Sequence, residues 1–252
     1  MGKFKDMTTT DTPPVDIARL LIDQVKEYNT WSPRSQQVTV GASEIGHPCA
    51  RRLAYKLLSV DPVNTDTDSW PAIVGTSVHY YLERAFKKNP DYLTEVKVVM
   101  EPWTKGTADL VHLPSRTVID HKVVGTTALK KYRKEGMSHQ YRVQLNTYAL
   151  GLRLAGYEID NIAIMFWSRS GMMRDAFSIT EPYDENLVDD TFKRFDAIKA
   201  MVEVGTSVLP LIPTTPTHCM YCPYFFPLSS EITESCNGVK TVDPTQPNKI
   251  ER

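Results

Sequence analysis

The most informative pattern of hydrophobic and polar positions lies near the middle of the chain, where a turn separates two short apolar runs. The runs cover residues 107–113 and 117–124, both rich in Val, Ile, Leu and Thr, and Pro114 begins the break between them. Apolar runs bounded by turn residues are typical of two neighbouring β-strands. Alternate side chains of a strand share a face, so we expect Asp120 and Lys122 to point the same way.

The segments on either side of this pair of strands alternate between helical and extended patterns. Apolar residues recur at helical spacing in five segments: 16–28, a helix capped by Ser43 and running to about Leu58, a helix from Pro71 to about Lys88, 138–156 ending at Gly156, and 185–204. Short apolar runs predict further strands at 93–100, 162–167 and 176–179. The helix at 16–28 is interpreted as a docking helix without chemistry.

The polar and proline-rich ends of the chain set the expected domain limits. Residues 1–14 are polar and are predicted to be a disordered tail, as are residues 237–252. Between them we expect one folded domain over residues 15–236. Its expected parts are a helical part over about 15–90, a core over about 91–205 and a cysteine-bearing end over about 206–236.

Composition narrows the classes of protein that this sequence can encode. The 252 residues are 41% hydrophobic, enough for one domain with a buried core. Lys and Arg number 29 against 30 Asp and Glu, a net charge of −1, so any nucleic acid must bind to a local basic patch. We expect no membrane span and no signal peptide. The four cysteines then favour a metal over disulfides in a reducing cytoplasm.

Candidate chemistry begins with the charged residues of the central strands. Asp109 lies on the strand beside Asp120 and Lys122, and a charged pair inside an apolar strand needs a partner. Two carboxylates with an adjacent lysine form a hard oxygen site for Mg²⁺ or Mn²⁺, with a cation to act on a phosphate or a water. The structural alternative is an ion pair at a strand end.

The cysteines form a second candidate site. Cys219 and Cys222 make one C-x-x-C pair, Cys236 follows, and Cys49 lies far upstream. A metal site built from all four requires the two ends of the domain to meet, and closing so long a loop stabilises a fold. Zinc held by four thiolates fits this pattern, and His47 or His218 can replace a cysteine in such a site.

These residues together resemble a known family of enzymes. The residues Gly106–Asp109 followed by Asp120, His121 and Lys122 resemble the PD-(D/E)XK nuclease core in its RecB-like branch. The G-x-x-x-H motif of that branch matches Gly75 to His79, and its Q-x-x-x-Y motif matches Gln144 to Tyr148. The resemblance extends over residues 40–240. A subset of the branch carries four cysteines on an iron–sulfur cluster. This subset includes the CRISPR-associated RecB-family exonucleases and the AddB-type nuclease domain.

The resemblance implies a fold and a set of site residues. The fold would be α/β, a restriction-endonuclease-like core with a central mixed β-sheet flanked by helices and with iron–sulfur-stapled N- and C-terminal segments. The metal ligands would be His79, Asp109, Asp120 and the backbone carbonyl of His121, holding Mg²⁺ or Mn²⁺. The catalytic residues would be Asp109, Asp120, Lys122, Gln144 and Tyr148. A [4Fe–4S] cluster, with Zn²⁺ as the alternative, would bind Cys49, Cys219, Cys222 and Cys236.

The implied function is a metal-dependent deoxyribonuclease that acts as an exonuclease on single-stranded DNA ends by a one- or two-metal mechanism. The alternative is a DNA-end binding module with a nuclease-like fold that does not cut. Recombination, replication or CRISPR-type proteins are the partners expected. Basic and aromatic residues predicted to contact DNA are Arg51, Arg52, Lys130, Lys131, Tyr132 and Arg133.

Overall fold

The computed structural model describes residues 16–30, 39–65, 68–217 and 219–238. The chain divides into two compact units, residues 1–37 and residues 38–252. The predictions for residues 1–14, for His218 and for the tail beyond Gly238 lie outside the described residues.

The first unit contains one described helix, α1 (Ile17–Thr30), which confirms the helix predicted there. Its apolar stripe is exposed to solvent, with exposed fractions between 41% and 59%, at Ile17, Leu20, Leu21, Ile22 and Val25. Whether this stripe docks on another surface stays a prediction.

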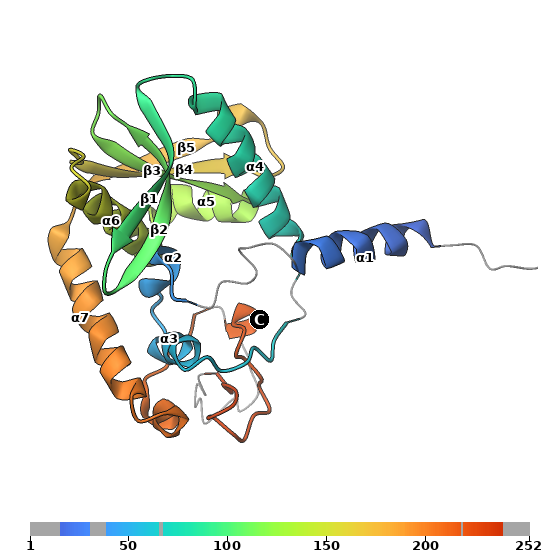
Figure 1. The fold of residues 1–252 in the computed structure, drawn as a ribbon. Helices are drawn as coiled ribbons and strands as arrows, with labels where there is room; N and C mark the ends of the chain where they lie inside the picture. Colours follow the sequence, from blue (N-terminus) through green and yellow to red (C-terminus); the bar gives the residue numbers. More distant parts are fainter. Residues whose placement is uncertain (1–15, 31–38, 66–67, 218, 239–252) are drawn as a thin grey trace, which may run out of the picture. The chain divides into compact units, whose positions relative to one another are not determined.

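The second unit is built on a five-stranded mixed β-sheet with the strand order β1-β2-β3-β4-β5 (Figure 1). The strands are β1 (Tyr92–Met100), β2 (Thr104–His112), β3 (Thr117–Val124), β4 (Asn161–Ser168) and β5 (Phe177–Pro182). All neighbours pair antiparallel except β3 and β4, which are parallel. A parallel pair needs a long crossover connection, and α5 (Thr126–Glu135) and α6 (His139–Leu154) form it.

Two of the helices, α6 and α7 (Glu185–Val202), begin at residues whose side chains accept a hydrogen bond from a free backbone amide. Ser138 accepts a hydrogen bond from the amide of Tyr141 at the start of α6, and Asp184 does the same for α7. The prediction of one helix from Ser43 to Leu58 is wrong. The segment forms two helices, α2 (Ala42–Ile45) and α3 (Ala50–Leu57). Pro48 lies in the break, and proline disfavours helical backbone in the residue before it.

Helices cover both faces of the sheet. On one face α6 lies close to β1, since a Cβ atom on Gly151 would come within 2.4 Å of the sulfur of Met100. A glycine is therefore required for this approach. On the other face lies α4 (Trp70–Phe86), whose Phe86 ring is 4.9 Å from that of Tyr92 in β1.

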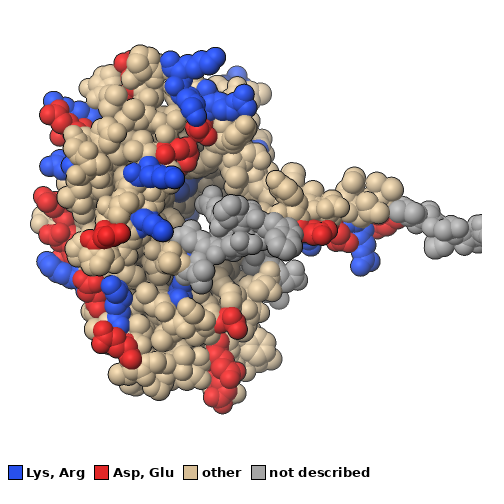
Figure 2. Space-filling view, in the orientation of Figure 1, with Lys and Arg blue, Asp and Glu red and all other residues tan. Residues whose placement is uncertain are grey.

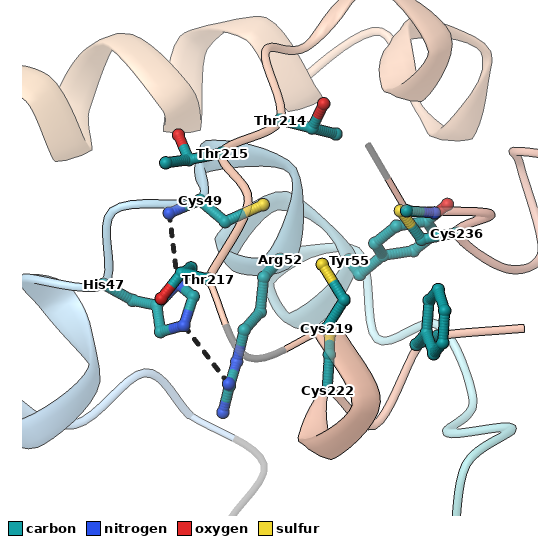
Figure 3. A pocket seen from close by; sticks show the side chains of 12 residues that line it. His47, Cys49, Arg52, Tyr55, Thr214, Thr215, Thr217, Cys219, Cys222 and Cys236 are labelled. Atoms are coloured by element: carbon teal, nitrogen blue, oxygen red, sulfur yellow. Dashed lines mark hydrogen bonds between the residues drawn. The ribbon is translucent and has the colours of Figure 1, made fainter. Parts of the chain in front are cut away.

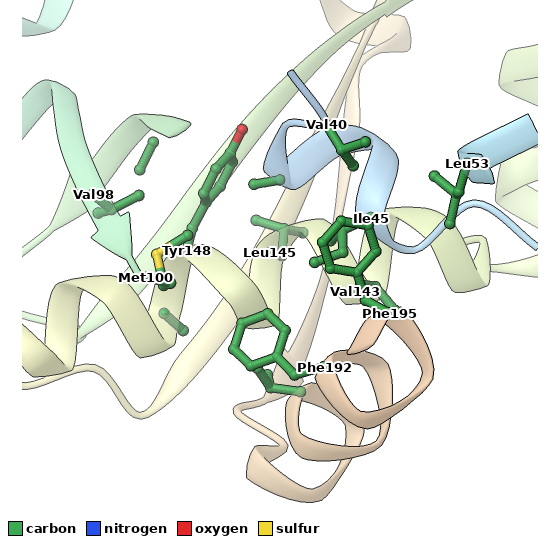
Figure 4. Close-up of a cluster of buried hydrophobic side chains, with 14 of the residues drawn as sticks. Val40, Ile45, Leu53, Val98, Met100, Val143, Leu145, Tyr148, Phe192 and Phe195 are labelled. Carbon is green, nitrogen blue, oxygen red and sulfur yellow. The ribbon is translucent and has the colours of Figure 1, made fainter. Parts of the chain in front are cut away.

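The hydrophobic core lies between the sheet, α6 and α7 (Figure 4). Its members are buried side chains, among them Val98, Met100, Val143, Leu145, Leu152, Phe192 and Phe195. The sheet is thereby held rigidly from β1 to β5, which fixes the strand ends that carry the candidate chemistry.

The last part of the unit folds back against the early helices, through η2 (Thr206–Leu211) and η3 (Cys219–Tyr221). Arg51 donates from its backbone amide to the carbonyl of Pro213 and from its side chain to that of Ile212. The ring of Tyr55 stacks on that of Tyr224 with centroids 5.0 Å apart. The two ends of the domain therefore meet, as the spacing of the cysteines requires. In the part of the chain that the structure describes, every helix is too short or too polar to cross a membrane.

Candidate functional site

The candidate site lies where the β2–β3 ladder ends. The two strands pair from His112 opposite Thr117 to Leu110 opposite Ile119. The same register would place Asp109 opposite Asp120, but there the pairing stops and the strands separate. The two carboxylates are therefore the first groups beyond the ladder, where the backbone leaves room for side chains to turn toward each other.

Asp109 is held by the neighbouring strand. Its Oδ2 accepts a hydrogen bond from the backbone N–H of His121 at 2.8 Å. On the far side of Asp109 the partner position in β1 is Glu95, which has a left-handed backbone at φ 50°. The β1–β2 pairs Thr94–Leu110 and Val96–Ala108 are formed around it, without one at Glu95 itself. A non-glycine residue in this conformation marks a local distortion of the strand beside Asp109.

Asp120 and Lys122 point the same way, as strand alternation predicts. The Nζ of Lys122 lies 2.5 Å from Oδ2 of Asp120. The Lys122 ammonium also lies over the ring of Tyr141 in α6, 5.1 Å from its centroid. The sequence pattern did not predict this contact, because the crossing of α6 over β3 decides it.

Gln144 connects α6 to the buried carboxylate. Its Nε2 donates to Oδ1 of Asp120 at 2.7 Å and to the hydroxyl oxygen of Tyr148 at 3.1 Å. Gln144 is 5% exposed and Asp120 2% exposed, so this contact is shielded from water. The structure thus brings both polar residues of the Q-x-x-x-Y motif to the site.

His79 reaches the site from α4, on the other face of the sheet. Its Nδ1 lies 3.4 Å from Oδ2 of Asp109, and its ring meets that of His121 edge-on with centroids 6.0 Å apart. Glu83, one turn further along α4, forms an ion pair with Lys87 at 3.3 Å.

The two carboxyl groups have pKa values shifted in opposite directions. Burial raises the pKa of Asp109, but the hydrogen bond and charge of His79 outweigh it, and the pKa lies below its usual range. Burial raises the pKa of Asp120 above its usual range, and the Lys122 ammonium offsets this only in part. The negative charge of Asp109 adds to the rise for Asp120. The two carboxyl groups therefore differ in how readily each carries a negative charge.

The histidines are affected by the same carboxylates. Burial lowers the pKa of His79, but the hydrogen bond to Asp109 raises it by more, so the pKa lies above its ordinary value. Burial lowers the pKa of His121 to about 4, so its side chain is neutral at ordinary pH.

The donor chemistry of this site fits a divalent cation. Carboxylate oxygen, imidazole nitrogen and backbone carbonyl suit Mg²⁺ or Mn²⁺. The Oδ2 of Asp120 is buried and receives no directed hydrogen bond from any described residue, so it retains a lone pair beside the Lys122 ammonium. No three His, Cys, Asp or Glu side chains of the described ranges converge closely enough to hold one ion.

The four cysteines line one pocket (Figure 3). Cys49 comes from the start of α3, Cys219 and Cys222 from η3 and the residue after it, and Cys236 from the last described segment. All four thiols are free. Burial raises the pKa of the Cys222 thiol, although Arg52 works against this. His47 lines the same pocket, and its Nε2 lies 3.3 Å from Arg52.

The residues predicted to contact DNA are dispersed. Arg51 binds backbone carbonyls of the C-terminal segment, and Arg52 lines the cysteine pocket. The ring of Tyr132 stacks on Phe166 at 4.6 Å and is partly buried, so it is not free to stack on a base. Arg133 donates to the carbonyl of Asp175 at 2.7 Å. Lys130 and Lys131, by contrast, have exposed side chains on α5. Over the face seen in Figure 2, acidic and basic side chains are interspersed.

Comparison with known proteins shows the fold. No protein-family model matches the sequence, and no curated protein is significantly similar to it. An alkaline exonuclease from Laribacter hongkongensis is similar in structure, with a TM-score of 0.50 and 13% identity over 71% of this chain and 93% of its own. The same exonuclease in complex with dAMP matches at 0.50 and 15% identity, over 70% and 93%. A phage-related exonuclease from Haemophilus somnus matches at 0.43 and 14%, over 65% and 80%. The predicted fold, a mixed sheet flanked by helices as in exonucleases, is confirmed.

Proposed function

We propose that this protein is a metal-dependent deoxyribonuclease that removes nucleotides from the ends of single-stranded DNA. The observation that carries the proposal is the pair Asp109 and Asp120 beyond the end of the β2–β3 ladder, with Lys122 2.5 Å from one carboxylate. The exonuclease-like fold supports it. A structural ion pair with Lys122 needs only one carboxylate, whereas here a second one, Asp109, lies close enough to raise the pKa of Asp120.

Each residue has a role in hydrolysis. Asp109, Asp120, His79 and the carbonyl of His121 would hold Mg²⁺ or Mn²⁺, which when bound lowers the pKa of a water and stabilises charge on the phosphate. The Lys122 ammonium orients the attacking hydroxide or offsets charge on phosphorus. The hydroxide oxygen forms the new P–O bond while the bond to the leaving oxygen breaks, without a covalent enzyme intermediate.

Gln144 and Tyr148 keep the reacting groups in place. The hydrogen bond from Gln144 fixes one oxygen of Asp120, so the other oxygen keeps its direction. The same amide nitrogen of Gln144 also donates to the Tyr148 hydroxyl. Removal of the Gln144 or the Tyr148 side chain therefore loosens the Asp120 carboxylate, which is otherwise shielded from water.

A digestion assay with end-labelled strands tests the proposal. Wild-type protein should degrade single-stranded DNA with Mn²⁺ and fail with EDTA, and blocked termini should stop it. Lys122→Ala should lose cutting by at least about 100-fold, whereas Lys130→Ala, an exposed lysine on α5, should keep it. Binding of labelled DNA should be nearly unchanged in Lys122→Ala. If Lys122→Ala digests DNA at the wild-type rate, Lys122 has no part in the reaction.

One observation favours a second candidate, a module that binds DNA ends without cutting. In the described ranges each carboxylate already has a protein partner, and no three ligands converge on one point. Such a module would bind labelled ends with micromolar or better affinity and leave them intact at every Mn²⁺ concentration. The same assay therefore separates the two candidates.

We also propose that the four cysteines bind an iron–sulfur cluster. They come from both ends of the domain to one pocket. A four-iron cluster binds one thiolate per iron, which matches the four free thiols that line this pocket. Zn²⁺ held by four thiolates is the alternative. Iron and zinc analysis with a visible spectrum of protein purified without oxygen tests this assignment.

A further inference from the structure

A second pocket lies on the α4 side of the sheet, beside the candidate site. Its volume is about 220 Å³. It is an open pocket between one face of α4, the ends of β3 and β4 and the loop into η1 (Met173–Asp175), with walls from Val74, Val78, Val123, Trp167, Arg169 and Met172. No residue predicted to bind metal or DNA lines it.

The pocket adjoins the candidate site through neighbouring residues and ring contacts. Val78 directly precedes His79, and Val123 directly follows Lys122. The indole N–H of Trp167 donates to Nδ1 of His121 at 3.3 Å. The His121 ring then meets that of His79. A group seated against Trp167 is therefore separated from Asp109 by only two side chains.

The walls and volume suit a flat aromatic ring. A cavity of about 150 Å³ lined by apolar side chains admits benzene, so 220 Å³ leaves room for a nucleobase. Three valines and a tryptophan form the inner walls, and bases stack on aromatic side chains regardless of their identity. Met172 and Met173 at the outer wall are 59% and 81% exposed. Such flexible side chains adapt to purines and pyrimidines alike.

A positive charge at the rim suits the phosphate attached to such a base. Arg169 follows β4 and is exposed, and its backbone amide donates to the carbonyl of Val124. Within the described part of the chain, its guanidinium forms no ion pair and no hydrogen bond. An exposed guanidinium of this kind can bind a phosphate through two parallel hydrogen bonds.

We propose that this pocket binds the nucleobase of the terminal nucleotide of the DNA strand, with Arg169 on the phosphate beside it. The proposal rests on the proposed function, because it assigns the end of the strand to a position beside the catalytic residues. It explains how the protein can position the end of the strand at the catalytic residues although acidic and basic side chains are interspersed on the face seen in Figure 2. It also predicts little preference among the four bases.

The test compares two oligonucleotides, one intact and one carrying an abasic tetrahydrofuran residue at both ends. Wild-type protein should cleave the intact strand at least about tenfold faster. Val74→Trp, which fills the pocket, should reduce this ratio to about one, and Val99→Trp, on an exposed valine of β1, should leave it unchanged. Arg169→Ala should slow both substrates equally. A Val74→Trp protein that retains the full ratio would overturn the proposal.

Two further measurements separate this proposal from the proposed function. Hydrolysis of a small chromogenic phosphodiester should be equal in wild type and Val74→Trp, which shows that the variant is folded and its catalytic residues are intact. If wild-type protein cuts neither DNA nor the small ester, the proposed function fails. Binding of the two labelled oligonucleotides then tests the pocket by itself: a ratio that Val74→Trp abolishes supports it, and equal binding of both by wild type overturns it.

Discussion

The Asp109 carboxylate accepts the backbone N–H of His121 at 2.8 Å, so a side chain of β2 fixes the backbone of β3 between Asp120 and Lys122. The bond replaces the ladder hydrogen bonds that end one residue earlier. Asp109 therefore has two roles, one in the structure and one in the proposed chemistry, and they can be separated by substitution.

Asp109→Asn and Asp109→Ala form a matched pair for this purpose. Asparagine keeps an oxygen that can accept the His121 amide, so Asp109→Asn should stay within about 1 kcal/mol of wild-type stability and lose DNA cutting. Alanine leaves that amide without a partner and should cost about 1–3 kcal/mol more. Urea unfolding and the digestion assay check both variants. Equal stability of the two would contradict the structural role.

Two glycines of the motifs that resemble the nuclease family should respond oppositely to alanine. A Cβ atom on Gly106 would lie 2.7 Å from Cε1 of Tyr148, so Gly106→Ala should destabilise by about 1–3 kcal/mol and weaken cutting by displacing that ring. A Cβ atom on Gly75 would meet nothing within 4 Å. Since glycine weakens a helix interior, Gly75→Ala should stabilise by about 0.5–1 kcal/mol. Thermal unfolding of both variants checks the packing around the two glycines.

Removing one cysteine at the start of the domain should affect its far end. Cys49→Ala should abolish the visible absorption of the proposed cluster and lower Tm, because the link between the early helices and the C-terminal segment is lost. Met220→Ala, at an exposed residue between Cys219 and Cys222, serves as the control and should leave both unchanged. Protein that melts alike with and without Cys49 would rule out a stabilising cluster.

Acid should destabilise the start of α6 through His139. Burial lowers the pKa of His139, and the charges of Arg194 and Arg142 lower it further. A histidine whose folded pKa lies below its unfolded value of about 6.5 contributes stability above that pH, and this contribution is lost as the pH falls below it.

The variant His139→Gln cannot take up this proton. Between pH 7.5 and pH 5.5 the free energy of unfolding should therefore fall less in His139→Gln than in wild type. Other histidines titrate in both proteins, so only the difference between the two curves reports on His139. Parallel curves would show that its protonation is not coupled to folding.

The sequence by itself determined the elements and their chemistry. Alternating apolar runs gave all five strands to within three residues at either end, because residues in a half-buried strand must alternate between water and core. The pairing of Asp120 with Lys122 followed from strand geometry alone. Spacing also indicated that Cys49 belongs with the later cysteines, and the structure brings all four to one pocket.

Local sequence failed where a helix broke or a side chain found a distant partner. The break between α2 and α3 follows from Pro48, whose effect competes with the apolar pattern around it. The sequence predicted that Tyr132 contacts DNA, but the packing of α5 on β4 stacks its ring on that of Phe166.

Only the tertiary structure decided which groups meet at the site. The opposite pKa shifts of Asp109 and Asp120 depend on burial and on His79 and Lys122, which arrive from different elements. The pocket beside Trp167 exists because α4 crosses the ends of β3 and β4. Such distances between segments are set by how whole faces pack, and no local pattern of residues encodes them.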